Sequence, residues 1–93
     1  IIQITQYHNL EHLALNFHKF LSDETIRIIV QSCPNIRYLN LEFCHTTDIV
    51  VEAIAQSCRN MEYLNIYGSE SITDSSISKI AKKCSKIQKL ELG

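Results

Sequence analysis

The chain has 93 residues, of which 45% are hydrophobic and 20% are charged, and its formal net charge at pH 7 is −1. This length predicts a single domain, residues 1–93, and the near-neutral charge gives no reason to expect nucleic acid or a membrane surface as a partner. No apolar run approaches the roughly 20 residues that a membrane-spanning helix requires, so we expect no membrane partner.

A unit of about 25 residues repeats along the chain. Cysteine opens three copies, at Cys33, Cys58 and Cys84, which are 25 and 26 residues apart (58 − 33 and 84 − 58). A further copy, in which tyrosine replaces the cysteine, starts at Tyr7. The units therefore cover residues 7–32, 33–57, 58–83 and, in part, 84–93, about three and a half repeats. Self-similarity at this period predicts a solenoid of stacked units.

The first half of each unit has the alternating pattern of a short β-strand. Leucine or isoleucine recurs at alternate positions and is expected to point inward: Leu13 and Leu15, Leu39 and Leu41, Leu64 and Ile66, Leu90 and Leu92. The residues between them point to the opposite face. They form three expected columns across the units: His12, Tyr38, Tyr63 and Lys89; Ala14, Asn40, Asn65 and Glu91; and Asn16, Glu42, Tyr67 and Gly93.

The second half of each unit predicts a helix of two to three turns. It starts at Asp23, Asp48 and Asp74, and apolar residues follow at spacings of three and four. Ser22 and Thr47 stand where a short side chain can cap the first turn. The expected core-facing residues are Ile26, Ile29, Val30, Val51, Ile54, Ala55, Ile77, Ile80 and Ala81. Residues 1–6 are expected to be the tail of a preceding helix or, as an equal alternative, a frayed end of the chain.

Three features of this pattern occur together: the cysteine that opens the units, the L-x-x-L-x-L-x-x-C spacing from Ile36 to Cys44, and Ile72-Thr73-Asp74 before the last helix. They resemble the cysteine-containing leucine-rich repeats of F-box/leucine-rich-repeat proteins and of Amn1-like mitotic-exit antagonists. The resemblance covers residues 7–93, although Tyr7 and His18 depart from the pattern. It implies an α/β fold, a right-handed leucine-rich-repeat solenoid (a horseshoe segment), with parallel strands on the concave face and helices on the convex face.

In proteins of this family the repeats hold the substrate of an SCF ubiquitin ligase, and a separate F-box binds a Skp1-type adaptor. The resemblance therefore implies a protein–protein interaction module, the substrate-binding repeats of an F-box-type subunit in ubiquitin-dependent protein degradation. No F-box and no initiator Met are visible, so we expect a fragment of a longer protein whose other parts contact the adaptor. The alternative is an F-box-free scaffold or regulatory inhibitor. An intracellular location, cytoplasmic or nuclear, is expected because the chain has no Asn-x-Ser/Thr acceptor.

The outward columns supply the candidate binding residues for a protein partner. Tyrosine offers a large contact area with few rotatable bonds, and asparagine and glutamate beside it offer hydrogen-bond partners. The alternative is that these residues only stabilise neighbouring strands as cross-strand pairs. The candidates are His12, Asn16, Tyr38, Asn40, Glu42, Tyr63, Asn65, Tyr67, Lys89 and Glu91.

The cysteines are expected to be buried structural thiols, because three share one repeat position and Cys44 fills the Asn/Cys position of its unit. A disulfide between stacked neighbours such as Cys33 and Cys58 is the alternative. Cys44 and His45 are adjacent, but no third group is marked to orient the histidine, so we expect no catalytic residues. No C-x-x-C pair marks a metal site, and neither a metal nor another cofactor is expected.

Overall fold

The computed structural model describes residues 9–18 and 20–92. The helix tail expected at residues 1–6 and the Gly93 position of the third column lie outside this part of the chain. Strands and helices alternate, in the order β1 (His12–Ala14), α1 (Asp23–Ser32), β2 (Tyr38–Asn40), α2 (Asp48–Ser57), β3 (Tyr63–Asn65), α3 (Asp74–Lys83) and β4 (Lys89–Glu91). The expected α/β class is confirmed.

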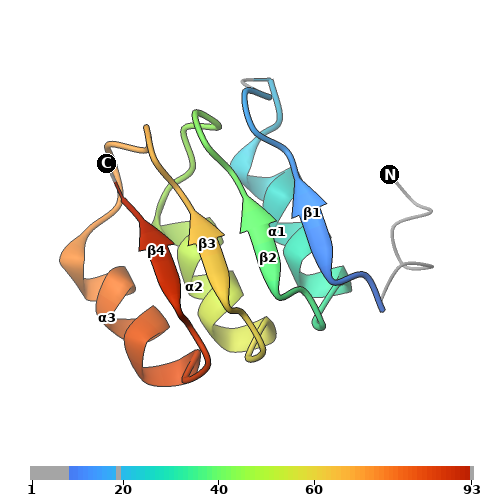
Figure 1. Cartoon of the computed structure of the whole chain (residues 1–93). Helices are drawn as coiled ribbons and strands as arrows, with labels where there is room; N and C mark the ends of the chain where they lie inside the picture. Colours follow the sequence, from blue (N-terminus) through green and yellow to red (C-terminus); the bar gives the residue numbers. More distant parts are fainter. Residues whose placement is uncertain (1–8, 19, 93) are drawn as a thin grey trace.

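The strands form one parallel four-stranded sheet in sequence order, β1-β2-β3-β4 (Figure 1). Leu13, Leu39, Leu64 and Leu90 are direct neighbours across the sheet, as the repeat predicts. Each strand has only three residues, although backbone hydrogen bonds between neighbours continue into the turns that follow. The Phe17 N–H donates to the backbone carbonyl of Glu42, and the Phe43 N–H donates to the backbone carbonyl of Tyr67, each at 2.8 Å. The third expected column therefore lies in turns and not on strands.

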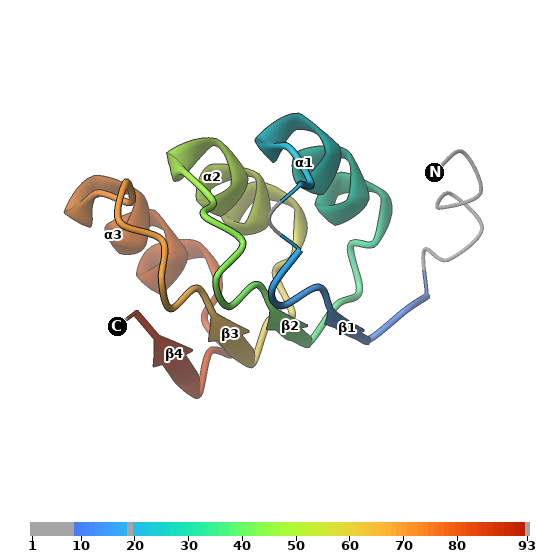
Figure 2. The same cartoon turned by 90° about the horizontal axis from the view of Figure 1, so that it is seen from above.

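All three helices pack on one face of the sheet, so the fold has two layers (Figure 2). Each helix has ten residues and starts at the expected aspartate. Ser22 caps α1 by accepting the Thr25 N–H at 3.2 Å, and Thr47 caps α2 by accepting the Ile49 N–H. Such bonds satisfy N–H groups that have no partner inside the helix. Within residues 9–18 and 20–92, every helix is about half as long as a membrane span requires.

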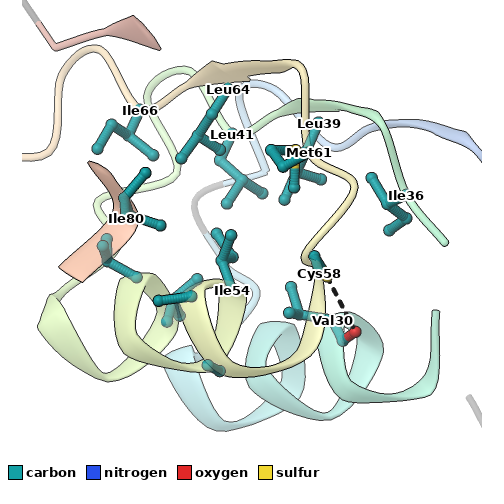
Figure 3. Close-up of a cluster of buried hydrophobic side chains, with 14 of the residues drawn as sticks. Val30, Ile36, Leu39, Leu41, Ile54, Cys58, Met61, Leu64, Ile66 and Ile80 are labelled. Carbon is teal, nitrogen blue, oxygen red and sulfur yellow. Dashed lines mark hydrogen bonds between the residues drawn. The ribbon is translucent and has the colours of Figure 1, made fainter. Parts of the chain in front are cut away.

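The core lies between the two layers and is formed mostly by the predicted inward residues (Figure 3). Leu39 and Leu64 are fully buried at the centre of the sheet, whereas Leu90 on the edge strand is only partly buried. Two predictions of burial are wrong: Ala81 is exposed, and Leu92 is 47% exposed. The equivalent of Ala81 in α2 is Ala55, which lies in the buried cluster shared with α3. No helix follows α3 in the described residues, so Ala81 has no such neighbour.

The four cysteines are buried and unpaired, which confirms the expectation of structural thiols. A cysteine directly follows the last residue of each helix: Cys33 after α1, Cys58 after α2 and Cys84 after α3. The backbone N–H group of each cysteine donates to a carbonyl in the last turn of its helix. The Cys58 thiol also donates to the carbonyls of Val30, at 3.6 Å, and Cys33, at 3.7 Å. The Cys84 thiol donates to the Cys58 carbonyl at 3.5 Å. The thiols thus satisfy carbonyls at the C-terminus of the preceding helix and link neighbouring units.

A second row of hydrogen bonds links the N-termini of the helices. Asp48, the first residue of α2, accepts from the Thr73 N–H at 2.9 Å and from the Thr73 hydroxyl at 2.7 Å. The hydroxyl of Ser76 donates to the same carboxylate, and these bonds, that of Ser76 most of all, lower the pKa of Asp48. Thr47 donates in the same way to Asp23 of the preceding unit. Each unit is therefore tied to the next at both ends of its helix.

Replacement of Leu64 by alanine should lower the free energy of unfolding by about 2–5 kcal/mol, because it removes fully buried carbons and leaves a cavity. Urea-induced unfolding followed by circular dichroism measures this loss. The matched control is Leu90→Ala at the same repeat position of the edge strand, where partial burial predicts a smaller loss. Equal losses at the two positions would contradict this location of the core.

Alkaline pH should destabilise the protein through Cys58. Burial raises the pKa of this thiol from its ordinary 9.0 to about 12. Because the folded-state pKa is the higher one, the stabilisation is complete below about pH 9 and is lost as the pH rises towards 12. Cys58→Ala should be less stable at neutral pH but should lose stability less steeply above pH 9. Parallel pH profiles of unfolding free energy for the two proteins would count against this explanation.

Candidate functional site

The sheet face that points away from the helices carries a continuous row of aromatic and basic side chains. Tyr38 and Tyr63, neighbours on β2 and β3, stack with ring centroids 4.3 Å apart and planes at 12°. His12 lies 5.6 Å from the Tyr38 ring on one side, and the Lys89 ammonium lies 5.8 Å from the Tyr63 ring on the other. We call these four residues the strand-face row. The structure thus brings together all of the first predicted column.

A row of ion pairs runs along the N-terminal ends of the same strands. The Arg37 guanidinium bonds to both carboxylate oxygens of Glu62, at 2.7 and 3.3 Å, and to Glu11 at 2.9 Å. Glu62 and then Glu11 raise the pKa of Arg37, while Arg37 holds the pKa of Glu62 below its ordinary value. The bidentate interaction with Glu62 holds the guanidinium in one orientation. Arg37 and its two glutamates were not among the predicted site residues.

The strand-face row and the ion pairs enclose a shallow depression of about 270 Å³. Its lining residues are His12, Arg37, Tyr38, Glu62, Tyr63, Gln88 and Lys89. The lining thus combines the stacked rings of Tyr38 and Tyr63 with charged groups of both signs. Aromatic and arginine side chains are the residue types most enriched at protein interfaces.

Side chains of the second predicted column form hydrogen bonds to other groups of the protein. The side-chain oxygens of Asn40 and Asn65 accept the backbone N–H groups of Glu42 and Tyr67, at 3.0 and 2.9 Å, which stabilises the turns after the strands. Asn65 is only 6% exposed. Glu91 accepts the Tyr63 hydroxyl, and this bond raises the pKa of Tyr63 to about 12. Of these side chains, that of Glu91 orients a residue of the strand-face row, Tyr63.

The residues of the third predicted column, which lies in the turns, differ in their exposure to solvent. Asn16 and Glu42 are half-buried, whereas Tyr67 is 45% exposed. Beside this column lie two aromatic residues that were not predicted, Phe17 and Phe43. The sequence contains a signal for them, because they occupy the same position of successive units. That position follows the alternating strand pattern, so the period of the strand does not indicate where their side chains point.

Neither catalysis nor metal binding gains support from the cysteines. Cys44 is buried, its thiol donates to the Leu15 carbonyl at 2.8 Å, and burial raises its pKa, all of which disfavour a nucleophilic thiolate. The adjacent His45 is exposed and has a positive φ of 57°. Within residues 9–18 and 20–92, no three His, Cys, Asp or Glu side chains are grouped so that they could hold a metal ion.

Glu91→Gln should lower the pKa of Tyr63 from about 12 towards the ordinary value of 10, because the substitution replaces the hydrogen bond from the phenol to a carboxylate by a weaker one to an amide and removes the negative charge. The titration of the tyrosine ring resonances by NMR measures this pKa. Glu52→Gln on helix α2, where the carboxylate pairs with Lys79, is the control and should leave it unchanged. An unaltered Tyr63 titration in Glu91→Gln would show that the carboxylate does not act on the phenol.

Comparison of the chain with protein-family models and with curated proteins gives no match. The function proposed below therefore rests on the residues of the strand face and on the repeat pattern.

Proposed function

We propose that the chain is a segment of a right-handed leucine-rich-repeat solenoid, with its strands on the concave face and its helices on the convex face. The order of the parallel strands supports this, since each unit lies beside the next one along the chain. The repeated bonds of the cysteine thiols to the preceding unit support it as well. In a solenoid each repeat contacts only its neighbours, and the stacked strands create an extended binding surface.

The function that the strand face supports best is binding of a partner protein without catalysis. The observation that carries this proposal is the stack of Tyr38 and Tyr63, held between His12 and Lys89 on the face away from the helices. The bonds of Tyr63 to Glu91 and of Arg37 to Glu62 hold these side chains before any partner arrives. Such preorganisation reduces the entropy lost on binding. The partner is a protein substrate or a regulatory protein.

The proposed biological setting is an F-box-type subunit of an SCF ubiquitin ligase, inside the cell, in which these repeats hold the substrate for ubiquitin-dependent degradation. The cysteine-containing repeat pattern supports this setting through its resemblance to F-box/leucine-rich-repeat proteins. The Skp1-type adaptor would bind another part of the longer protein. An F-box-free scaffold or inhibitor would use the same strand face but would not bring the adaptor.

The test uses the full-length protein that contains this chain, tagged and purified from its own cells. Tyr38→Ala combined with Tyr63→Ala should remove a partner protein from the purified complex and leave the Skp1-type adaptor, because only the strand face is changed. Quantitative mass spectrometry of the co-purified proteins measures both. Ile49→Ala, at an exposed position on helix α2, is the control and should retain both proteins.

The outcomes separate the two settings. If the double tyrosine variant loses the partner and the wild-type complex contains no Skp1-type adaptor, the result favours the F-box-free scaffold. An unchanged set of co-purified proteins in the double tyrosine variant, with the fold intact by circular dichroism, would overturn the assignment of the binding face.

A further inference from the structure

A second aromatic surface lies in the turns that follow the strands. Phe17 stacks on Phe43 with ring centroids 5.5 Å apart, and Phe43 meets the edge of Tyr67 at 5.3 Å. We call these three residues the turn aromatics. Phe17 is 60% exposed, Tyr67 is 45% exposed, and Phe43 between them is half-buried. They therefore form a contiguous apolar surface in contact with solvent, apart from the strand-face row.

The backbone beneath this surface adopts a conformation that its residues disfavour. Phe17, Phe43 and Gly68 occupy the same position of successive units, and all three have positive φ angles, of 68°, 57° and 86°. Glycine adopts this left-handed region freely, but a bulky residue rarely does. Two units thus place phenylalanine where glycine or asparagine would avoid the strain.

Packing of the core does not account for these phenylalanines. The neighbouring inward residues Leu41 and Ile66 fill the core beneath the turns and are almost completely buried. Phe43 instead lies over Gly68, where an added Cβ would come within 2.5 Å of the Phe43 Cδ1 atom. Strained residues that the core does not require are characteristic of binding sites.

The charge beside the turn aromatics indicates the chemistry of a partner. A depression of about 490 Å³ lies at their C-terminal end, lined by Phe43, Tyr67, Gly68, Ser69, Glu70 and Leu92. Glu70 is exposed, and none of the ion pairs found among the described residues involves it. Among the described residues, Glu70 is the only charged one that lines the depression. The depression therefore combines aromatic rings with a carboxylate that forms no ion pair with the described residues.

Arginine is the side chain that matches this combination. Its planar guanidinium stacks on aromatic rings and bonds a carboxylate through two N–H groups at once. We propose that the turn aromatics and Glu70 form a docking site for an arginine-containing apolar segment of a partner protein. This site is separate from the strand-face row and does not depend on the function proposed for that row.

The test is an NMR chemical-shift titration of the protein with the peptide acetyl-Ala-Leu-Arg-Leu-Ala-amide. The expected shifts are at Phe43, Tyr67 and Glu70. The matched probe has citrulline in place of arginine, which keeps the shape and removes the charge, and it should bind about tenfold more weakly. Equal affinity for the two peptides, shifts confined to the strand-face row, or no shift with the arginine peptide would each overturn the proposal.

Three variants separate binding from folding. Glu70→Gln should remove the preference for arginine over citrulline, and Tyr67→Ala should weaken binding of both peptides. Phe17→Gly should weaken binding while its thermal unfolding temperature is kept or raised, because glycine suits the positive φ at this position. If Phe17→Gly instead lowers the unfolding temperature and leaves binding unchanged, the ring serves the fold and the proposal fails.

Two controls distinguish this site from the strand face. Glu52→Gln removes a carboxylate from helix α2 and should leave binding of the arginine peptide unchanged. Tyr38→Ala changes the strand-face row and should also leave it unchanged. If Tyr38→Ala abolishes peptide binding while Tyr67→Ala does not, the peptide binds the strand face and not the turn aromatics.

Discussion

The contact between neighbouring units is the constraint on which the rest of this structure depends. A strand of three residues and a helix of ten cannot enclose an apolar core alone. Each unit buries its leucines and isoleucines only because another unit lies beside it, as the contrast between central Leu64 and edge Leu90 shows. Stability is therefore gained by stacking, which is the general property of repeat architectures.

Stacking also requires that polar groups at the unit boundaries find partners. The structure meets this requirement at both ends of the helices. At the C-termini, the thiols of Cys58 and Cys84 bond to carbonyls of the preceding unit. At the N-termini, the carboxylate of Asp48 accepts bonds from Thr73 and Ser76 of the following unit. The bond from a cysteine thiol to the carbonyl of the preceding cysteine and the bond from a threonine hydroxyl to the preceding aspartate each recur at the same repeat positions. They therefore hold one register between units and disfavour a slipped one.

A common register has a direct consequence for the surface. It places chemically similar side chains beside one another, so that single residues become rows. On the strands, Tyr38 and Tyr63 stack in unstrained extended backbone and are oriented by Glu91 and by their neighbours. In the turns, Phe17 and Phe43 stack in left-handed backbone and remain largely outside the core. The first row has both basic and acidic groups around it, whereas Glu70 is the one charged group among the described residues that line the depression beside the second. The two surfaces therefore suit different partner segments.

The sequence by itself determined the repeat, the starts of the three helices, the buried cysteines and the neighbours across the sheet, such as Leu39 and Leu64. These features follow from periodicity, because the alternation of side chains in a strand and the spacing of three and four in a helix are properties of the local backbone. Only the tertiary structure decided that Asn65, at the end of β3, is buried, that Ala81 is exposed and that Arg37 joins two glutamates of neighbouring units. It also decided that exposed Phe17 stacks on half-buried Phe43. Burial and pairing of this kind depend on what the adjacent unit places beside a residue, and the pattern within one unit carries no information about that.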